Sequence, residues 1–231
     1  MSRLSIIVPT LDEAAGIFAC LSPLQPLRGR GVEVIVVDGG SADATAAVAA
    51  PLADRVIASP RGRAVQMNAG ARVAAGDTLL FLHADTRLPE SADRIVLEGL
   101  DASGRAWGRF DVTIEGRSPL LAVVAAFMNA RSRLTAIATG DQAIFARREA
   151  LARAGGFPEI ALMEDVAFSR AMKRLGRPLC LRDRVVTSGR RWERHGTLRT
   201  IVLMWRLRLA YFLGADPARL AERYGTGRAA R

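Results

Sequence analysis

The chain has few cysteines, and their positions exclude two kinds of protein. Its 231 residues include only Cys20 and Cys180, which lie far apart and outside any zinc-type spacing. We therefore expect neither a disulfide framework nor a cysteine-held metal, and this usage fits a reducing, cytoplasmic location. An internal repeat, a low-complexity segment and a flexible linker are also missing, which argues against a repeat protein or a string of domains.

The chain also lacks an apolar run long enough to span a membrane. The best candidate, residues 198–213, is about 16 residues long, and at ~1.5 Å per residue it reaches roughly 24 Å, short of the ~30 Å of a bilayer core. Three arginines interrupt it. On a helical wheel one apolar face carries Leu198, Ile201, Val202, Trp205, Leu209 and Phe212, and the other carries Leu203, Met204, Leu207 and Tyr211.

Two apolar faces on one helix require more than one contact surface. We expect the domain to cover the first face. For the second face the candidates are a homodimer contact, peripheral attachment to the inner face of the membrane, or the domain itself wrapping around the helix. Because leaving one Leu side chain wet forfeits ~1.5–3 kcal/mol, something should cover Leu203, Met204, Leu207 and Tyr211.

Lysine is nearly absent, so the positive charge of the chain is almost all arginine. Lys173 is the only lysine among 33 basic residues, against 23 acidic ones, for a formal charge of +10. Such a balance is typical of proteins that meet phosphate-bearing partners, which include nucleotides, nucleic acids and anionic membranes. Half of the residues are hydrophobic, which is ample for a folded core.

Apolar runs alternate with helical patterns from the start of the chain, which predicts an α/β protein with a parallel sheet. We predict strands over residues 4–8, 32–37, 56–57 and 79–82, with helices after Thr10, over 42–50 capped by Ser41, and over 62–75. The later part predicts helices over 92–100, 120–128, 164–175 and 198–213, and strands over 107–113 and 140–145.

Polar clusters follow four of these strands. They occupy residues 10–13, 38–41, 83–85 and 140–142, and a fifth acidic pair, Glu164-Asp165, begins a helix. Each cluster alone is explained by a helix cap or a turn. Together they lie where open α/β sheets bind ligands, at the carboxyl ends of strands. Acidic residues there in a basic protein indicate a divalent cation and a phosphorylated ligand.

The ordered set of motifs resembles family-2 glycosyltransferases. Ile-Ile-Val-Pro-Thr-Leu-Asp-Glu-Ala at 6–14, Val-Val-Asp-Gly-Gly-Ser-Ala-Asp at 36–43, Asn68 with Gly70, Gly76-Asp77 and His-Ala-Asp-Thr at 83–86 are similar to their nucleotide-sugar half. Gly140-Asp141-Gln142 and Met163-Glu164-Asp165 are similar to the acceptor half, and Arg191-Trp192 to a later motif. The resemblance covers about residues 4–195.

The resemblance implies a fold and a domain division. The fold is GT-A, a Rossmann-like, mixed, mostly parallel sheet flanked by helices, here with a C-terminal helical extension. The implied division is a glycosyltransferase domain over 1–195, with a nucleotide-sugar half over 1–90 and an acceptor half over 91–195, followed by the extension over 196–231.

The resemblance also implies roles for residues that match the motifs. Thr10, Glu13 and Asp38 would line the nucleotide pocket, with Asp38 near the base or ribose and Arg63 near the base or diphosphate. Asp85 would hold the Mg²⁺ or Mn²⁺ that bridges the diphosphate.

On the acceptor side the resemblance makes Asp165 the catalytic base of an inverting transfer, and the positive end of the helix dipole favours its ionised form. His83 stands where the family has an aspartate, and we expect it to be a hydrogen-bonding neighbour of the site rather than a metal ligand.

The predicted function is transfer of a sugar from a nucleotide donor, UDP-linked, to an acceptor hydroxyl on a small or lipid-linked molecule. One alternative is a sugar-phosphate nucleotidylyltransferase, which would need a glycine-rich basic loop where this chain has Pro9-Thr10-Leu11-Asp12-Glu13. Another is a non-catalytic basic module that binds nucleic acid or anionic lipid. Its arginines should gather on one face. Here they are dispersed apart from the C-terminal helix, so we expect no nucleic-acid partner.

Overall fold

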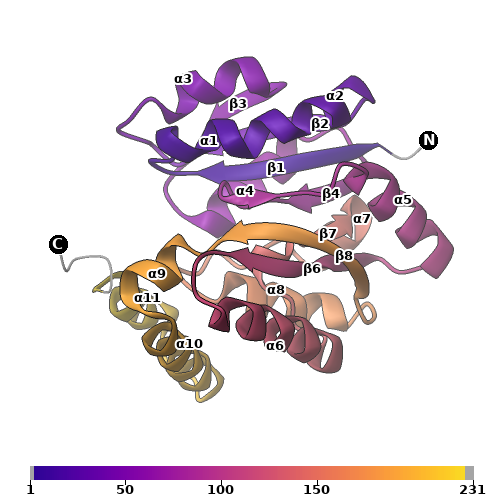
Figure 1. Cartoon of the computed structure of the whole chain (residues 1–231). Coiled ribbons are helices and arrows are strands. Elements are labelled where there is room, and N and C mark those ends of the chain that lie inside the picture. The colour runs from indigo at the N-terminus through magenta and orange to yellow at the C-terminus, as the bar shows by residue number, and fades with distance from the viewer. Residues whose placement is uncertain (1–2, 227–231) are drawn as a thin grey trace.

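The computed structural model describes residues 3–226 as an eight-stranded sheet with helices on both faces (Figure 1). The strands are β1 Leu4–Thr10, β2 Glu33–Asp38, β3 Arg55–Ala58, β4 Thr78–Phe81, β5 Thr86–Arg87, β6 Trp107–Glu115, β7 Phe145–Arg147 and β8 Leu179–Ser188. The helices are α1 Ala14–Leu21, α2 Gln25–Gly29, α3 Thr45–Ala49, α4 Arg63–Val73, α5 Ala92–Ser103, α6 Leu120–Thr135, α7 Arg148–Arg153, α8 Glu164–Lys173, α9 Arg190–His195, α10 Thr197–Phe212 and α11 Pro217–Thr226.

The sheet has the order β3-β2-β1-β4-β7-β6-β8-β5. The first four strands are parallel, β7 is antiparallel to both of its neighbours, and β6 and β8 pair in parallel. The predicted α/β class with a mixed, mostly parallel sheet flanked by helices is therefore confirmed, and C-terminal helices follow the last strand.

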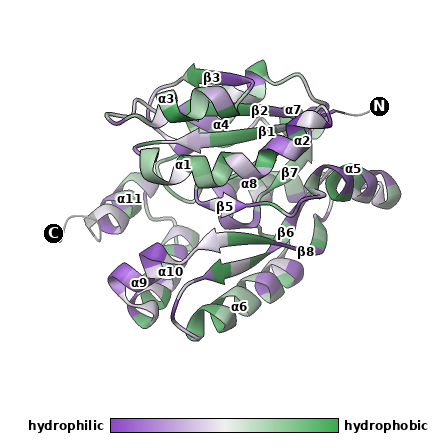
Figure 2. Ribbon diagram, turned by 45° about the horizontal axis from the view of Figure 1, so that its top comes forward, coloured by the Kyte–Doolittle hydropathy of each residue, from purple (hydrophilic) through white to green (hydrophobic). Residues whose placement is uncertain are grey.

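Burial on both faces explains why the central strands are continuous apolar runs. In β1, Ile6 and Val8 enter one core with helices α1, α2, α5 and α6, whereas Ile7 enters a second core with Met67 of α4 and Phe168 of α8. Figure 2 shows the hydrophobic colour over much of β2 and α6. The alternation along β1 thus packs helices against both faces of the sheet.

The predicted strand over residues 140–145 is wrong over most of its length. Residues Gly140–Gln142 form a 3-10 turn, η3, and β7 begins only at Phe145. The turn is stabilised by reciprocal capping between Thr139 and Gln142, and Ala143 then adopts a left-handed φ of 44°. A capping pair therefore overrides the strand pattern of the apolar residues that follow.

Strand β8 was missed in the sequence. Its centre carries the exposed residues Arg182, Asp183 and Arg184, which interrupt the apolar pattern. The pairing with β6 has an irregularity there, because Arg109 lies opposite Cys180 but Asp111 lies opposite Arg184. The extra residues leave the ladder and face solvent, as in a β-bulge.

The predicted helix over 42–50 begins later than expected, at Thr45, and Ser41 does not cap it. The Ser41 hydroxyl instead donates to the Asp38 carboxylate and accepts a hydrogen bond from the Asp12 amide. The amide of Thr45 donates to Asp43. The polar residues before α3 therefore close a loop beside β2 rather than extend the helix.

The chain itself covers the second apolar face of α10, which was one of the three candidates, but it leaves open the first face, which it was expected to cover. The second face is covered because Leu207 packs with Ile137, Met163 and Leu220 of α11, and Leu203, Met204 and Tyr211 lie against this cluster. The other face is open, with Leu198, Val202, Trp205, Leu209 and Phe212 each at least half exposed. Residues 227–231 of the predicted extension lie outside the described part.

None of the helices within residues 3–226 combines the length and the apolar character that crossing a bilayer requires.

Close packing of α4 on the sheet gives a first prediction. A Cβ at Gly70 would lie 2.5 Å from Ile7 Cγ2 and 3.0 Å from Val37 Cγ2, so alanine cannot fit without a shift. We expect Gly70→Ala to lower the free energy of unfolding by up to about 2 kcal/mol, since overpacking costs ~1–3 kcal/mol and alanine returns ~1 kcal/mol of helix propensity.

Urea unfolding measures this change, and Gly29→Ala in α2 is the matched control. Nothing lies within 4 Å of a Cβ at Gly29, so only the propensity gain should remain there. Equal stability of the two variants would refute the packing argument.

Candidate active site

The carboxyl ends of β1 and β2 form one hydrogen-bonded edge. Thr10 is paired with Asp38 in the strand register, and both are buried. Gln66 of α4 donates through Nε2 to the backbone oxygens of Thr10 and Val37, at 2.8 Å each. A Cβ at Gly39 would lie 3.0 Å from the Gln66 side chain, which accounts for glycine at this position. The predicted nucleotide residues Thr10 and Asp38 are therefore side by side.

The Asp38 carboxylate holds the loop that follows β2. Its Oδ2 accepts hydrogen bonds from the amides of Gly40 and Ser41 at 3.1 and 2.9 Å, and its Oδ1 accepts from the Ser41 hydroxyl. Both carboxylate oxygens accept hydrogen bonds from this loop. Asp38 therefore fixes the shape of the loop beside the edge.

Glu13 links this edge to the C-terminal part of the chain. Its amide donates to the Thr45 hydroxyl at 2.8 Å, and its Oε2 lies 3.7 Å from Arg190 Nη2 at the start of α9. The segment that contains Arg191-Trp192 is thereby held near the edge formed by β1 and β2.

Asp85 lies between β4 and β5 and is half-buried. The buried Cys20 thiol is close to it: burial, together with the negative charges of Asp85 and Glu13, raises the pKa of Cys20 to about 12. Within residues 3–226 Asp85 forms no salt bridge, although Thr86 donates to its Oδ1 at 3.4 Å. No arginine, lysine or histidine side chain in this part of the chain therefore forms an ion pair with Asp85.

These residues fit a divalent cation only if a ligand completes its shell. No group of three His, Cys, Asp or Glu side chains within the described part of the chain could hold a metal by itself. Mg²⁺ and similar ions are commonly held by one or two carboxylates together with substrate phosphates and water. Asp85 supplies one such carboxylate.

His83 contacts an acidic neighbour through one ring nitrogen, while its Nε2 is buried without a hydrogen-bond partner within residues 3–226. Its Nδ1 lies 3.3 Å from Asp141 Oδ1. Burial acts to raise the pKa of Asp141, but His83, Arg63 and Arg208 outweigh it, so this pKa lies below its ordinary value.

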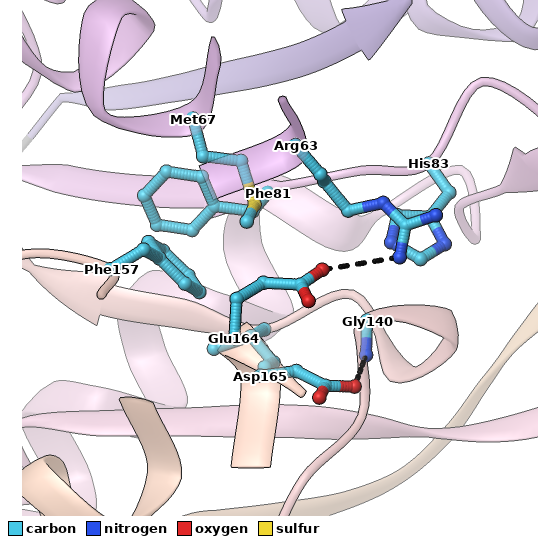
Figure 3. A pocket seen from close by; sticks show the side chains of 9 residues that line it. Arg63, Met67, Phe81, His83, Gly140, Phe157, Glu164 and Asp165 are labelled. Atoms are coloured by element: carbon cyan, nitrogen blue, oxygen red, sulfur yellow. Dashed lines mark hydrogen bonds and ion pairs between the residues drawn. The ribbon is translucent and has the colours of Figure 1, made fainter. Parts of the chain in front are cut away.

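Beyond the end of β4 lies a small pocket between α4, η3 and α8 (Figure 3). One wall is apolar and consists of Met67, Phe81 and Phe157, with the two rings packed edge to face at 4.7 Å between centroids. The other wall is charged and is formed by Arg63, His83, Glu164 and Asp165 together with Gly140. The pocket brings Arg63 and Asp165, which are far apart in the sequence, into one site.

An ion pair crosses this pocket between Arg63 and Glu164. Arg63 Nη1 lies 3.2 Å from Glu164 Oε1, and Glu164 is 4% exposed whereas the Arg63 side chain is about half exposed. Burial raises the pKa of Glu164, and Asp165 adds to this effect while Arg63 opposes it. Burial acts to lower the pKa of Arg63, but Glu164 and its acidic neighbours raise it above its ordinary value.

Backbone amides hold Asp165. The amide of Gly140 donates to its Oδ2 at 3.1 Å, and its own helix supplies the Val166 amide to Oδ1 at 2.7 Å. Gly140 can have no side chain here, since a Cβ would lie 2.2 Å from His83 Nε2. The sequence contains Gly140, but the reason for it appears only when η3 and β4 are placed side by side.

Two arginines that the sequence did not single out add positive charge near Asp165. Burial, reinforced by Arg208 of α10, lowers the pKa of Arg131 of α6 to about 10, and Asp165 counteracts this. The Nε and Nη2 atoms of Arg131 are buried without a hydrogen-bond partner within residues 3–226. In the sequence, Arg131 and Arg208 are each one of two or more arginines in a largely apolar helix, which gives no signal that they lie near the site.

The structure therefore gathers the predicted site residues in three places. Thr10 and Asp38 form the edge of β1 and β2, Glu13 and Asp85 are both close enough to Cys20 for their charges to raise its pKa, and Arg63 and Asp165 line the pocket.

A family model described as Glycosyl transferase family 2 matches residues 5–152. The PGL/p-HBAD biosynthesis glycosyltransferase of Mycobacterium bovis (strain BCG / Pasteur 1173P2) is 42% identical over 94 residues, which cover 38% of this chain and 37% of that protein. The match to these curated relatives thus spans little more than a third of their length.

Solved structures match over more of the chain. The mannosyltransferase PcManGT from Pyrobaculum calidifontis, in complex with GDP-Man and Mn²⁺, has a TM-score of 0.64 at 22% identity and covers 99% of this chain and 70% of its own. Residues 1–349 of S. aureus TarS, in complex with UDP-GlcNAc, have a TM-score of 0.65 at 19% identity, with 80% and 58% covered. At such identities the likeness concerns the fold.

The architecture and its strand-end polar residues define the GT-A class of α/β proteins. Within that class, the chain belongs to glycosyl transferase family 2, which is an inverting family. Of the functions considered from the sequence, this membership favours sugar transfer over nucleotidyl transfer and over a non-catalytic basic module.

The raised pKa of Glu164 predicts a pH-dependent stability. The unfolded chain loses the Glu164 proton at a lower pH than the folded chain, so deprotonation destabilises the folded state as the pH rises from the ordinary glutamate pKa through the raised one. The free energy of unfolding of the wild type, minus that of Glu164→Gln, should therefore fall with rising pH across this interval.

Urea unfolding over a pH series measures this difference. Glu98→Gln, at an exposed carboxylate of α5, is the control for the loss of one charge. A difference that stays flat or rises with pH would contradict the raised pKa.

Proposed function

We propose that the chain transfers a sugar from a nucleotide-linked donor to an acceptor hydroxyl, with inversion at the anomeric carbon. The observation that carries the proposal is the pocket of Figure 3, where Asp165 is fixed by the Gly140 amide and faces a site that also contains Arg63. A half-buried carboxylate held by amides, beside a cation, suits proton abstraction next to an anionic leaving group.

On the donor side we assign Thr10, Glu13, Asp38 and Arg63 to the nucleotide. The adjacency of Thr10 and Asp38 at the carboxyl ends of β1 and β2 supports this, because ligands of open α/β sheets bind at such ends. Two solved structures with this fold contain UDP-GlcNAc and GDP-Man, and we propose a UDP-linked donor here. Arg63 is the cation nearest the pocket and would meet the diphosphate.

For the metal we assign Asp85, which would hold Mg²⁺ or Mn²⁺ together with the diphosphate oxygens. A divalent cation at that place offsets the negative charge that grows on the leaving diphosphate. The unpaired state of the Asp85 carboxylate within residues 3–226 supports this role. The structure of PcManGT contains Mn²⁺ with its donor.

The proposed step is a single displacement. The acceptor oxygen bonds to the anomeric carbon on the face opposite the diphosphate, while the bond from that carbon to the phosphate oxygen breaks and the diphosphate leaves with the electron pair. Asp165 accepts the hydroxyl proton. Arg63 lies in the same pocket and stabilises the leaving charge, and Glu164 positions Arg63 through the ion pair.

We further propose the division into a nucleotide-sugar half over 1–90, an acceptor half over 91–195 and a C-terminal extension over 196–231. Arg63 of α4 and Glu164 of α8 come from the two halves and meet in the pocket, which supports a site between them. Both cysteines are free thiols, which supports the proposed cytoplasmic location.

The metal assignment predicts how nucleotide binding depends on Asp85. UDP should raise the melting temperature in the presence of Mn²⁺ or Mg²⁺ and much less with EDTA, and Asp85→Ala should abolish the metal-dependent part. A ligand at 100 times its dissociation constant adds ~2.7 kcal/mol, which a thermal shift detects readily.

Asp183→Ala, at an exposed carboxylate of β8, is the matched control and should respond like the wild type. A parallel series with GDP tests the choice of nucleotide. Equal stabilisation by UDP with and without EDTA would overturn the role of Asp85.

The base assignment predicts a loss of turnover without a loss of donor binding. Asp165→Asn keeps the shape of the side chain but cannot take the proton, so turnover should fall by roughly 10²–10⁴ while the UDP-induced thermal shift is retained. Glu164→Gln should have a milder effect, and Asp183→Asn should have none. Turnover is measured as release of the nucleoside diphosphate, and wild-type turnover in Asp165→Asn would identify another residue as the base.

A further inference from the structure

Helices α6 and α10 each expose a row of apolar side chains, and the two rows meet at a pair of aromatic rings. These side chains, defined here as the α6–α10 surface, are Leu120, Val123 and Phe127 of α6 and Leu198, Val202, Trp205, Leu209 and Phe212 of α10. The two helices meet through Phe127 and Trp205, whose ring centroids are 6.0 Å apart although the side chains are 52% and 59% exposed. Figure 1 shows both helices on the same side of the sheet.

Exposed hydrophobic side chains are concentrated on this surface. Of the large ones that are exposed within residues 3–226, only Phe18 lies outside α6, α10 and the residue that follows α10. Single exposed apolar residues are normal, but a contiguous patch of this kind marks an interaction site. We therefore expect a binding partner to cover the α6–α10 surface.

The charges on the two helices are of one sign. Neither α6 nor α10 contains an aspartate or glutamate, and the exposed Arg199 and Arg206 border the apolar face of α10. In a symmetric dimer the same patch would meet itself and bring these arginines toward their own copies. An anionic lipid surface instead complements them, and tryptophan favours the boundary between lipid and water.

The inner side of α10 connects this surface to the candidate active site. Leu207 packs in one cluster with Met163 and Val166, the residues that flank Glu164 and Asp165. Arg208 of α10 lies close enough to Arg131 and Asp141 for its charge to shift their pKa values. A partner on the outer side of α10 would therefore lie near the acceptor side of the pocket.

We propose that the α6–α10 surface binds the interfacial region of an anionic lipid bilayer. The apolar side chains enter the boundary between head groups and acyl chains, and Arg199 and Arg206 contact the anionic head groups. This docking does not depend on the proposed sugar transfer, so its test uses no activity measurement.

The test is flotation of the purified full chain with phosphatidylcholine vesicles that contain or lack phosphatidylglycerol. The wild type should float with the anionic vesicles and remain at the bottom with the neutral ones. Removing two aromatic anchors in Phe127→Ser/Trp205→Ser should reduce the partition coefficient by at least about tenfold, since each anchor contributes buried apolar area. Arg199→Gln/Arg206→Gln should weaken binding to the anionic vesicles.

Phe18→Ser is the matched control, because Phe18 of α1 is 60% exposed and lies outside the surface. It should float like the wild type, and urea unfolding should show that every variant is folded. The proposal is overturned if the wild type binds neither vesicle, if it binds both equally, or if Phe18→Ser releases it as fully as the aromatic pair. A dimer in light scattering that Trp205→Ser dissociates would also overturn it, because a second copy would then cover the surface.

Discussion

The parallel pairing of β1 with β2 and β4 determines where the polar side chains of this chain lie. The three strands are buried on both faces, and their register ends them at a common edge, with Thr10 beside Asp38. Apolar residues therefore fill most of each strand, and the polar residues of this edge occupy the last strand positions, Thr10 and Asp38, or the loops that follow. His83 and Asp85 come directly after β4 for the same reason, and the loops at this edge can approach a ligand without disturbing either core.

This constraint explains why strands β1, β2 and β4 within residues 1–90 could be predicted from sequence. A strand buried on both faces has a simple pattern, an apolar run that ends in polar residues, and β1, β2 and β4 all show it. Two elements after residue 90 have no such pattern. Strand β8 carries three exposed charged residues at its irregularity, and η3 depends on hydrogen bonds between Thr139 and Gln142. At β8 the pairing with β6 overrides the local pattern, and at η3 a capping pair within the turn does so, so periodicity alone failed.

Helix α10 shows a different limit of sequence analysis. Its two apolar faces were visible on a helical wheel, but the wheel does not state which face meets the domain. That choice depends on Leu220 of α11 and on Met163 beside the pocket, which together enclose Leu207. Similarly, nothing in the sequence marks Arg131 and Arg208 as site residues. The packing of α6 and α10 brings their charges close enough to act on Asp165 and Asp141.

The pair Glu164-Asp165 places two carboxylates in different environments although they are neighbours in the chain. Glu164 is buried and compensated by Arg63, whereas Asp165 is half-buried, is held by two amides and forms no salt bridge within residues 3–226. An amide fixes a carboxylate without neutralising it, while a salt bridge commits the charge to its partner. In the proposed mechanism the first arrangement suits Asp165 to accept the acceptor proton, and the second holds Arg63 across the pocket. Neighbouring titratable groups whose surroundings differ in this way can serve separate roles, one chemical and one positional.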